Sequence, residues 1–263
     1  MENICKKVIN IAQEAGNFIR TERKSFDSGN VETKGVHDYV SYVDKRAEDI
    51  IIEKLGLLLP EAGFIAEEGT GSKKEGGLNW VIDPLDGTTN FIHGMPPFSV
   101  SIGLIDGKEM MLGVVYEVNL DECFYSWKDA HAYLNGEKIR VSDAKRVSDS
   151  LIATGFPYTE FKRMKPFLKS FQYFMENSHG LRRLGSAAVD LSYVACGRFD
   201  AFYEYGLSPW DVAAGAFIVK QAGGKISDFS GGDGFLFGGE LIASNGFVYD
   251  EFKADVERFM IAD

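Results

Sequence analysis

The sequence has few cysteines and histidines, and their spacing excludes several kinds of site. Only three cysteines, Cys5, Cys123 and Cys196, occur in 263 residues, and none of them forms a CxxC pair. This odd count and wide spacing argue against a disulfide framework or a zinc site and favour three reduced thiols. The four histidines form no metal-ligand motif, so nothing here predicts a catalytic histidine.

Positive charge and long apolar runs are also scarce. The chain has 28 Lys and Arg against 39 Asp and Glu, a formal net charge of −11. Such a chain repels phosphate backbones, so we expect no nucleic-acid partner. No apolar run approaches the roughly 20 residues that span a bilayer, and residues 1–20 are too polar for a signal peptide. We therefore expect a cytoplasmic protein that has no membrane partner.

Apolar periodicity in the first half predicts two helices and a sheet. The first helix has one apolar face, formed by Ile4, Val8, Ile11, Ala15 and Phe18. The second runs from about Asp44 to Leu59 and is stopped by Pro60, and its buried side is predicted to hold Ala47, Ile50, Ile51, Leu55 and Leu58. Strands are predicted at 64–66, 80–82, 99–105, 110–116 and 122–127. These elements suggest two helices laid on a sheet of hairpins.

The second half alternates strands with helices. Strands are predicted at 151–154, 199–205 and 241–244, and helices at 160–177, 187–196, 211–221 and 248–260. This pattern is typical of a second α/β set of layers. We predict an N-terminal α+β part, residues 1–147, and a C-terminal α/β part, residues 148–263. No linker is obvious between them, so the two parts are expected to share a close interface.

The clearest chemical signal lies in residues 80–90, WVIDPLDGTTN. Asp83 and Asp86 are three apart around Pro84, which should end the preceding strand. Converging carboxylates repel each other and are costly to desolvate, and a hard cation such as Mg²⁺ removes both problems. If a helical turn begins at the Gly-Thr-Thr run, its free N–H groups can bind phosphate. The alternative, an Asx or N-cap turn, would explain one acid better than this whole run.

Further acids and arginines occur at predicted element ends. Glu67 and Glu68 follow a strand, and either they form a solvated acidic turn or one of them points at the neighbouring strand end. Asp211 opens an apolar helix, where it is either an N-cap or a metal ligand brought in by the second part. Arg182 and Arg183 precede another helix and could hold an anion or pair with surface acids.

Taken together, these motifs resemble the inositol monophosphatase family of magnesium-dependent, lithium-sensitive phosphatases. The resemblance covers nearly the whole chain, in order and spacing, and is carried by Ala66–Glu68, Asp83–Asn90, Gly185–Ala188, Phe199–Glu204 and Trp210–Gly215. It implies a layered αβαβα sandwich, an α+β and α/β fold, and a homodimer. Arg183 suggests a bacterial-type member, and a phosphate role for Lys34 is left open.

The resemblance also implies roles for individual residues. The first magnesium would be bound by Glu67, Asp83 and the Leu85 carbonyl, and the second by Asp83, Asp86 and Asp211. A third, weaker magnesium would lie near Glu67. The attacking water would be oriented by Thr88 with Asp44 behind it, and Glu67 would complete the catalytic set. Phosphate would contact Gly87, Thr88 and Thr89, and substrate hydroxyls would meet Gly185, Ser186, Ala187, Glu204 and Asp211.

The implied function is a magnesium-dependent phosphomonoesterase acting on inositol monophosphate or a similar small polyol or sugar phosphate. Two metal ions about 3.5–4 Å apart can activate a water for in-line attack on phosphorus and neutralise the leaving oxygen. Relatives with these motifs act on histidinol phosphate, fructose 1,6-bisphosphate, NADP or 3′-phosphoadenosine 5′-phosphate, whereas Glu204 favours a hydroxyl-rich substrate. The alternative from another class is a non-catalytic binding protein, or a plain cation-binding protein. All the expected acids are present, which argues against the first, and the Gly-Thr-Thr run argues against the second.

Overall fold

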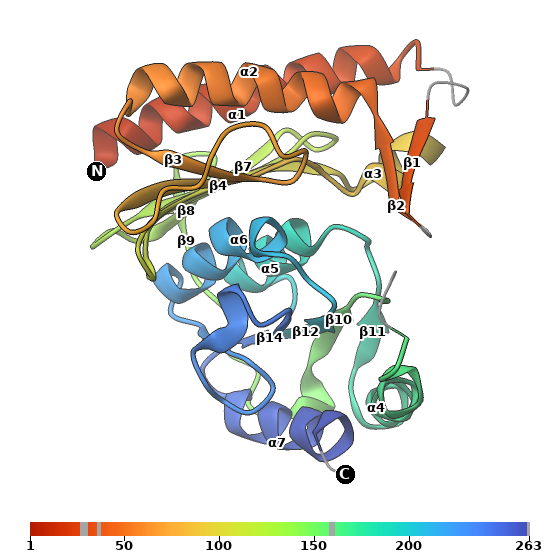
Figure 1. Ribbon diagram of the computed structural model, residues 1–263. Coiled ribbons are helices and arrows are strands. Elements are labelled where there is room, and N and C mark those ends of the chain that lie inside the picture. Colours follow the sequence, from red (N-terminus) through yellow and green to blue (C-terminus); the bar gives the residue numbers. More distant parts are fainter. Residues whose placement is uncertain (27–30, 36–37, 158–160, 262–263) are drawn as a thin grey trace.

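The computed structural model shows five stacked layers (Figure 1). It describes residues 1–26, 31–35, 38–157 and 161–261, with the backbone alone for 31–35 and 38–40. Helices α1 and α2 cover a seven-stranded sheet, α5 and α6 lie between this sheet and a five-stranded one, and α4 and α7 cover the far side. This confirms the predicted αβαβα sandwich.

The elements have the following bounds. The helices of the described residues are α1 (Glu2–Arg23), α2 (Tyr42–Leu58), α3 (Thr88–His93), α4 (Met164–Asn177), α5 (Ala187–Ala195), α6 (Pro209–Gln221) and α7 (Tyr249–Met260), with 3₁₀ turns η2 (Val147–Asp149) and η3 (Gly234–Leu236). A small hairpin is formed by β1 (Val31–Gly35) and β2 (Asp38–Ser41). The seven-stranded sheet comprises β3 (Gly63–Ala66), β4 (Leu78–Asp86), β5 (Ser99–Asp106), β6 (Glu109–Glu117), β7 (Glu122–Trp127), β8 (Ala132–Leu134) and β9 (Glu137–Ile139). The five-stranded sheet comprises β10 (Leu151–Thr154), β11 (Gly180–Arg182), β12 (Ala201–Tyr205), β13 (Lys225–Ser227) and β14 (Glu240–Ser244).

The seven-stranded sheet follows the chain order from β3 to β9. Only β3 and β4 pair in parallel, and every later pair is antiparallel, as the predicted hairpins require. Helix α1 packs on this sheet because its apolar residues recur at helical spacing. Of the face predicted for it, Val8, Ile11 and Ala15 are buried, whereas Ile4 and Phe18 are half-buried.

Helix α2 differs from its prediction in its start and in its buried face. It begins at Tyr42, because Ser41 caps it: the Ser41 hydroxyl oxygen accepts a hydrogen bond from the N–H of Val43 at 3.1 Å. Two acids, Asp44 and Glu48, are buried on this helix, whereas the predicted core residues Ile50 and Leu58 are only half-buried. The buried face of α2 is therefore rotated toward the candidate site.

The five-stranded sheet has the order β11-β10-β12-β14-β13 and is mixed. Strand β10 pairs in parallel with β11 and β12, whereas β14 pairs antiparallel with β12 and β13. The helix predicted at 160–177 begins at Met164: residues 161–163 form a turn, and residue 160 lies outside the described residues. Arg163 has non-helical dihedral angles and forms an ion pair with Glu240 of β14, which holds this turn in place.

Helix α6 packs unusually close to the seven-stranded sheet. A Cβ added at Gly113 of β6 would lie 2.6 Å from the carbonyl oxygen of Ala214, and one at Gly103 of β5 would lie 3.1 Å from the Cβ of Ala213. At these two positions the sheet thus carries no side chain between itself and α6. This close approach brings the first turn of α6, with Asp211, toward the end of β4.

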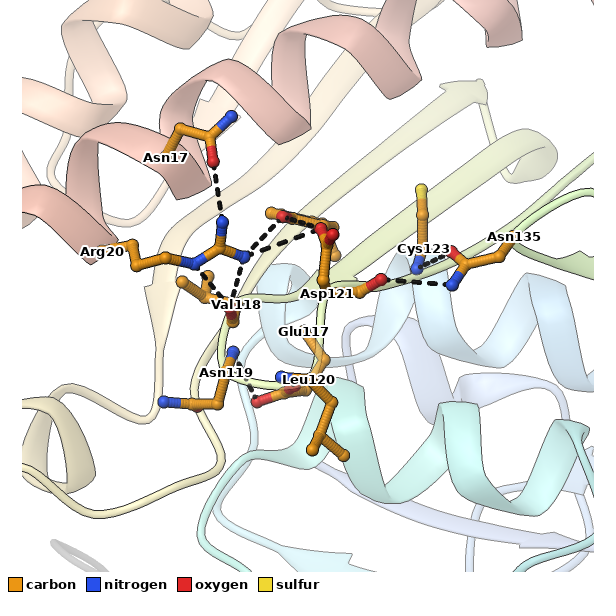
Figure 2. Close-up of polar contacts among 10 residues, drawn as sticks. Asn17, Arg20, Glu117, Val118, Asn119, Leu120, Asp121, Cys123 and Asn135 are labelled. Atoms are coloured by element: carbon orange, nitrogen blue, oxygen red, sulfur yellow. Dashed lines mark hydrogen bonds and ion pairs between the residues drawn. The ribbon is translucent and has the colours of Figure 1, made fainter.

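The end of α1 is tied to the β6–β7 turn by Arg20 (Figure 2). Its guanidinium donates to the carbonyl of Val118 from both Nε at 3.1 Å and Nη2 at 2.6 Å, and to the Tyr116 hydroxyl at 2.8 Å. Asp121 lies 3.6 Å from the same guanidinium. These contacts satisfy the Val118 carbonyl, which belongs to a fully buried residue, and fix the outer helix on the sheet.

The cysteines and the apolar character of the helices bear on two expectations from the sequence. Cys5, Cys123 and Cys196 are all free, as predicted. Among these residues, no helix combines the length and the apolar character needed to cross a membrane.

The contact between α6 and Gly113 gives a stability prediction. We expect Gly113→Ala to lower the free energy of unfolding by about 1–3 kcal/mol, because the added methyl group would overlap backbone that cannot move independently. Urea denaturation followed by circular dichroism measures this change. Gly56→Ala is the matched control: its Cβ would lie 3.9 Å from Phe64 inside α2, so it should leave stability unchanged or raise it. Equal stability of both variants would contradict the proposed close packing.

Candidate active site

The strand end that carries Asp83 and Asp86 has a bulge rather than a stop. Strand β4 continues to Asp86, so the expectation that Pro84 ends the strand is wrong. Asp83 pairs with Ser101 and Asp86 with Ser99, so β4 has one residue more than β5 across this stretch. Pro84 sits in this bulge, where its missing N–H breaks no ladder bond. The bulge presents both carboxyl groups at one end of the sheet.

Asp83 is the centre of a cluster of carboxyl groups. Its side chain forms hydrogen bonds with Glu67 and with Asp211, and it is 2% exposed. Strand β3 brings in Glu67, because Ala66 pairs with Ile82 and the N–H of Glu67 donates to the Ile82 carbonyl at 3.2 Å. Burial, and then the nearby charges of the other acids, raise the pKa of Asp83 well above its usual value.

Asp86 is bound to the start of α5. Its Oδ2 accepts hydrogen bonds from the Ser186 hydroxyl at 2.6 Å and from the N–H of Ala188 at 2.8 Å. Burial raises the pKa of Asp86 to about 6, and these hydrogen bonds oppose that shift. Ser186, predicted to face substrate, therefore has its hydroxyl directed to Asp86.

Asp211 comes from the first turn of α6. Pro209 occupies the first helical position, and the N–H of Ser208 donates to Asp211 Oδ2 at 2.6 Å, so the acid also caps its own helix. The N-cap residue is Ser208 and Asp211 is the third helical residue, so the expectation that Asp211 is the N-cap is wrong, and its role as a metal ligand stays a prediction. Burial, and then the charge of Asp86, raise the pKa of Asp211 to about 7.

A short helix, α3, begins directly after Asp86, as the Gly-Thr-Thr run suggests. Gly87 is its N-cap and has a φ of 95°, a left-handed conformation that glycine adopts without strain. The Thr88 hydroxyl lies 2.9 Å from Asp44 Oδ1 and 3.0 Å from the Leu85 carbonyl. Asp44 is itself fixed by the N–H and hydroxyl of Ser41, at 2.8 and 2.6 Å. The predicted pair Thr88 and Asp44 is therefore in direct contact.

The two segments predicted to contact substrate approach each other beside α3. The side-chain amide of Asn90 donates to the carbonyls of Pro97 at 2.7 Å and Leu184 at 2.8 Å. A Cβ at Gly87 would lie 3.3 Å from the Gly185 carbonyl oxygen. Residues 87–89 and 185–187 therefore border the same region. Lys34 lies in β1, whose side chains are outside the described part of the structure.

Glu204 lies on β12, with its carboxyl group directly against Gly155. A Cβ at Gly155 would lie 1.9 Å from the Glu204 carboxyl carbon, so any larger residue after β10 would displace the Glu204 carboxyl group. Burial, and then the charge of Asp211, raise the pKa of Glu204 well above its usual value, while Arg183 lowers it. Glu204 therefore belongs to the same group of acids as Asp211.

Two functional acids were missed by the sequence analysis. Glu48 of α2 is fully buried and accepts hydrogen bonds from the N–H groups of Glu68 at 2.8 Å and Thr70 at 2.9 Å, so it fixes the turn that carries Glu67. Asp190 of α5 is 1% exposed, and its Oδ1 has no hydrogen-bond partner among the described residues. Their signal in the sequence was weak: Asp190 is a single acid in an apolar helix, and Glu48 follows Asp44 by one turn without a motif of its own.

Arg183 faces these acids rather than the protein surface. Its positive charge lowers the pKa values of Asp86, Asp190 and Glu204 against the larger opposing effect of burial. Its guanidinium carbon lies 5.3 Å from the centre of the Phe156 ring. Arg183 thus acts on buried acids, whereas the two alternatives for the arginine pair were a bound anion and surface acids.

The carboxyl groups gathered around Asp83 are of the ligand type that a hard divalent cation prefers. Buried carboxyl groups with raised pKa values repel one another when ionised, and Mg²⁺ binds such oxygens in preference to sulfur or nitrogen. Among the described residues, no three His, Cys, Asp or Glu side chains have the arrangement of a ready-made metal site. The carboxyl groups of Glu67 and Asp211 instead bond to that of Asp83. Cation binding therefore requires loss of the shared protons and small side-chain rotations.

Comparisons with known proteins find similarity over nearly the whole chain. The family model described as the inositol monophosphatase family matches residues 1–259. An inositol-1-monophosphatase of Mesorhizobium japonicum is 39% identical over 239 residues, 90% of each chain. A protein named Nus factor SuhB of Pseudomonas aeruginosa is 40% identical over 250 residues, 93% of this chain and 92% of its own. The solved structure of an IMPase of Thermotoga maritima superposes with a TM-score of 0.89 at 35% identity, covering 98% of both chains.

The role of Glu48 can be tested by removing its charge. We expect Glu48→Gln to weaken Mg²⁺ activation by about tenfold, because the amide has one acceptor oxygen where the carboxylate uses two, so one of the two backbone N–H groups loses its partner and the Glu67 turn loosens. Phosphate release titrated with Mg²⁺ measures this change. Asp49→Asn removes an exposed charge one residue away and should leave the titration unchanged. Identical titrations of the two variants would show that Glu48 does not position the site.

Proposed function

Because the chain belongs to the inositol monophosphatase family, we propose that it is a phosphoric monoester hydrolase that uses Mg²⁺ to release phosphate from inositol monophosphate or another small polyol or sugar phosphate. The observation that supports this most directly is the meeting of Glu67, Asp83 and Asp211, from three separate segments, beside the start of α3. A binding protein without catalysis would have no need for buried acids next to free backbone donors.

We propose that two or three magnesium ions are bound by Glu67, Asp83, the Leu85 carbonyl, Asp86 and Asp211. Bound there, magnesium would supply charge that offsets the phosphoryl oxygens and would make a nearby water more acidic. The chain contributes the carboxyl groups and the hydrogen bonds that hold them. Asp86 keeps its position through Ser186 and Ala188, and Asp211 through Ser208.

The chain's own residues would orient the phosphate and the attacking water. The first N–H groups of α3, at Gly87, Thr88 and Thr89, have no partners within the helix and would donate to phosphate oxygens. Thr88 donates its single hydroxyl hydrogen to Asp44 or to the Leu85 carbonyl, and its oxygen can then accept a hydrogen bond from the water. Asp44 acts through Thr88, because the Ser41 donors hold its other oxygen.

Substrate choice is assigned to the wall formed by Gly185, Ser186, Ala187, Glu204 and Asp211. Glu204, confined by Gly155, would hydrogen bond to a substrate hydroxyl, which favours polyols such as inositol monophosphate. Histidinol phosphate, fructose 1,6-bisphosphate, NADP and 3′-phosphoadenosine 5′-phosphate are the competing substrates. The relative named Nus factor SuhB is as similar as the one named inositol-1-monophosphatase, so similarity alone does not select a substrate. We also propose lithium sensitivity, a homodimer and a cytoplasmic location.

A substrate panel tests this function. With Mg²⁺ we expect phosphate release from inositol 1-phosphate above that from the four competing substrates, and inhibition by lithium. Asp83→Asn should lower kcat/KM on the order of 10³-fold, about 4 kcal/mol of barrier, because it removes the carboxylate shared by both proposed metals. Release of inorganic phosphate, followed by a colorimetric assay, measures both effects.

The matched control for this assay is Asp106→Asn, an exposed acid in the β5–β6 turn, which should keep full activity. Unchanged turnover of Asp83→Asn would contradict the metal assignment. Release from none of the five substrates by the unaltered chain would contradict the proposed function.

A further inference from the structure

A cavity of about 840 Å³ opens at the C-terminal end of α6, the helix whose first turn carries Asp211. Ten residues separate Asp211 from Gln221, about 15 Å along the helix at 1.5 Å per residue. The cavity is lined by the end of α6, by the β5–β6 turn and by the segment around η3. It shares no residue with the candidate active site.

One part of the cavity wall is apolar and contains three phenylalanines. Phe217 of α6 and Phe235 and Leu236 of η3 are 4%, 5% and 7% exposed, and they form a packed surface. Phe237 differs from them, because it is 51% exposed and lies at the rim. Three phenylalanines around one hollow favour a flat ring as the occupant, since stacked and edge-to-face ring contacts are both attractive.

Two lysines and two acids line this cavity, so its lining has no net negative charge, whereas the chain as a whole carries −11. Lys108 and Lys220 line the cavity, and neither has a carboxylate within ion-pair distance in the described part of the chain. Of the two acids that line the cavity, Glu109 is already paired with Lys128 at 2.7 Å. Asp233 is the lining carboxylate that remains to offset the two ammonium groups. Within this acidic chain, two unpaired ammonium groups at one cavity form a local anion-attracting site.

Two contacts between lysine ammonium groups and phenylalanine rings place positive charge at this cavity. The Lys73 ammonium lies 5.3 Å from the centre of the Phe237 ring and adds positive charge at the rim. The Lys220 ammonium lies 4.8 Å from the centre of the Phe235 ring, in the last turn of α6. In this position it opposes the negative end of the helix dipole, which would otherwise repel an anion.

We propose that this cavity binds a small organic anion that carries a planar apolar ring. The ring would fill the phenylalanine-lined hollow, and the anionic group would lie at the rim near Lys108 and Lys220. The volume falls within the roughly 300–1,000 Å³ of small-molecule sites. A macromolecular partner would bury about 800 Å² of accessible surface, whereas most of the large apolar side chains here are already buried. The occupant is therefore a small molecule.

Fluorescence titration with 8-anilinonaphthalene-1-sulfonate, which has both rings and an anionic group, tests this proposal on the full chain with Mg²⁺. We expect saturable binding that 2-naphthoate displaces. Inorganic phosphate, which lacks the ring, and 2-naphthylmethylammonium, which carries the opposite charge, should displace it at least tenfold more weakly. Displacement by phosphate at the concentration effective for naphthoate would overturn the proposal, because the probe would then occupy the candidate active site.

Substitutions locate the bound probe. The double variant Lys108→Glu/Lys220→Glu should raise the Kd by about tenfold or more. Lys7→Glu/Lys138→Glu makes the same change in net charge at exposed positions elsewhere and should leave the Kd unchanged. Phe237→Ala, at a half-exposed rim position, should also weaken binding without loss of folding. Equal binding by the cavity variants and the control pair, or the absence of saturable binding by the unaltered chain, would refute the proposal.

Discussion

The mutual repulsion of buried carboxyl groups is the constraint on which the site depends. Asp83, Asp86, Glu204 and Asp211 each have a raised pKa, caused first by burial and then, for all but Asp86, by the charges of neighbouring acids. Arg183 offsets part of this repulsion. Such groups are stable in their ionised form only when positive charge lies close to them, which is why the proposed function places divalent metal among them.

The middle layer of the sandwich brings these acids together. The first turns of α5 and α6 reach the end of β4, where one binds Asp86 and the other supplies Asp211. This is feasible because Gly103 and Gly113 leave room for α6 on the sheet. The site therefore depends on backbone contacts far from the acids, and substitutions at the two glycines would act on activity through geometry.

Much of the site could be predicted from local sequence. The run from Asp83 to residue 89 contains acids, glycine and hydroxyl groups in a compact order, and the structure places a helix start there as expected. The bulge at Pro84 could not be foreseen, since it depends on the register against β5. Glu48 and Gly155 were missed because their roles come from residues distant in the chain. Glu48 lies one helical turn after Asp44, so the sequence does contain a signal for two acids on one face of this helix.

The most direct test of the account is to locate the metal. Crystals soaked in Mn²⁺, a substitute for Mg²⁺ at oxygen sites, can be measured for anomalous scattering from manganese. We predict two strong peaks about 3.5–4 Å apart, one bound by Glu67, Asp83 and the Leu85 carbonyl and the other by Asp83, Asp86 and Asp211. Peaks elsewhere in the molecule, with none at Asp83, would contradict the account.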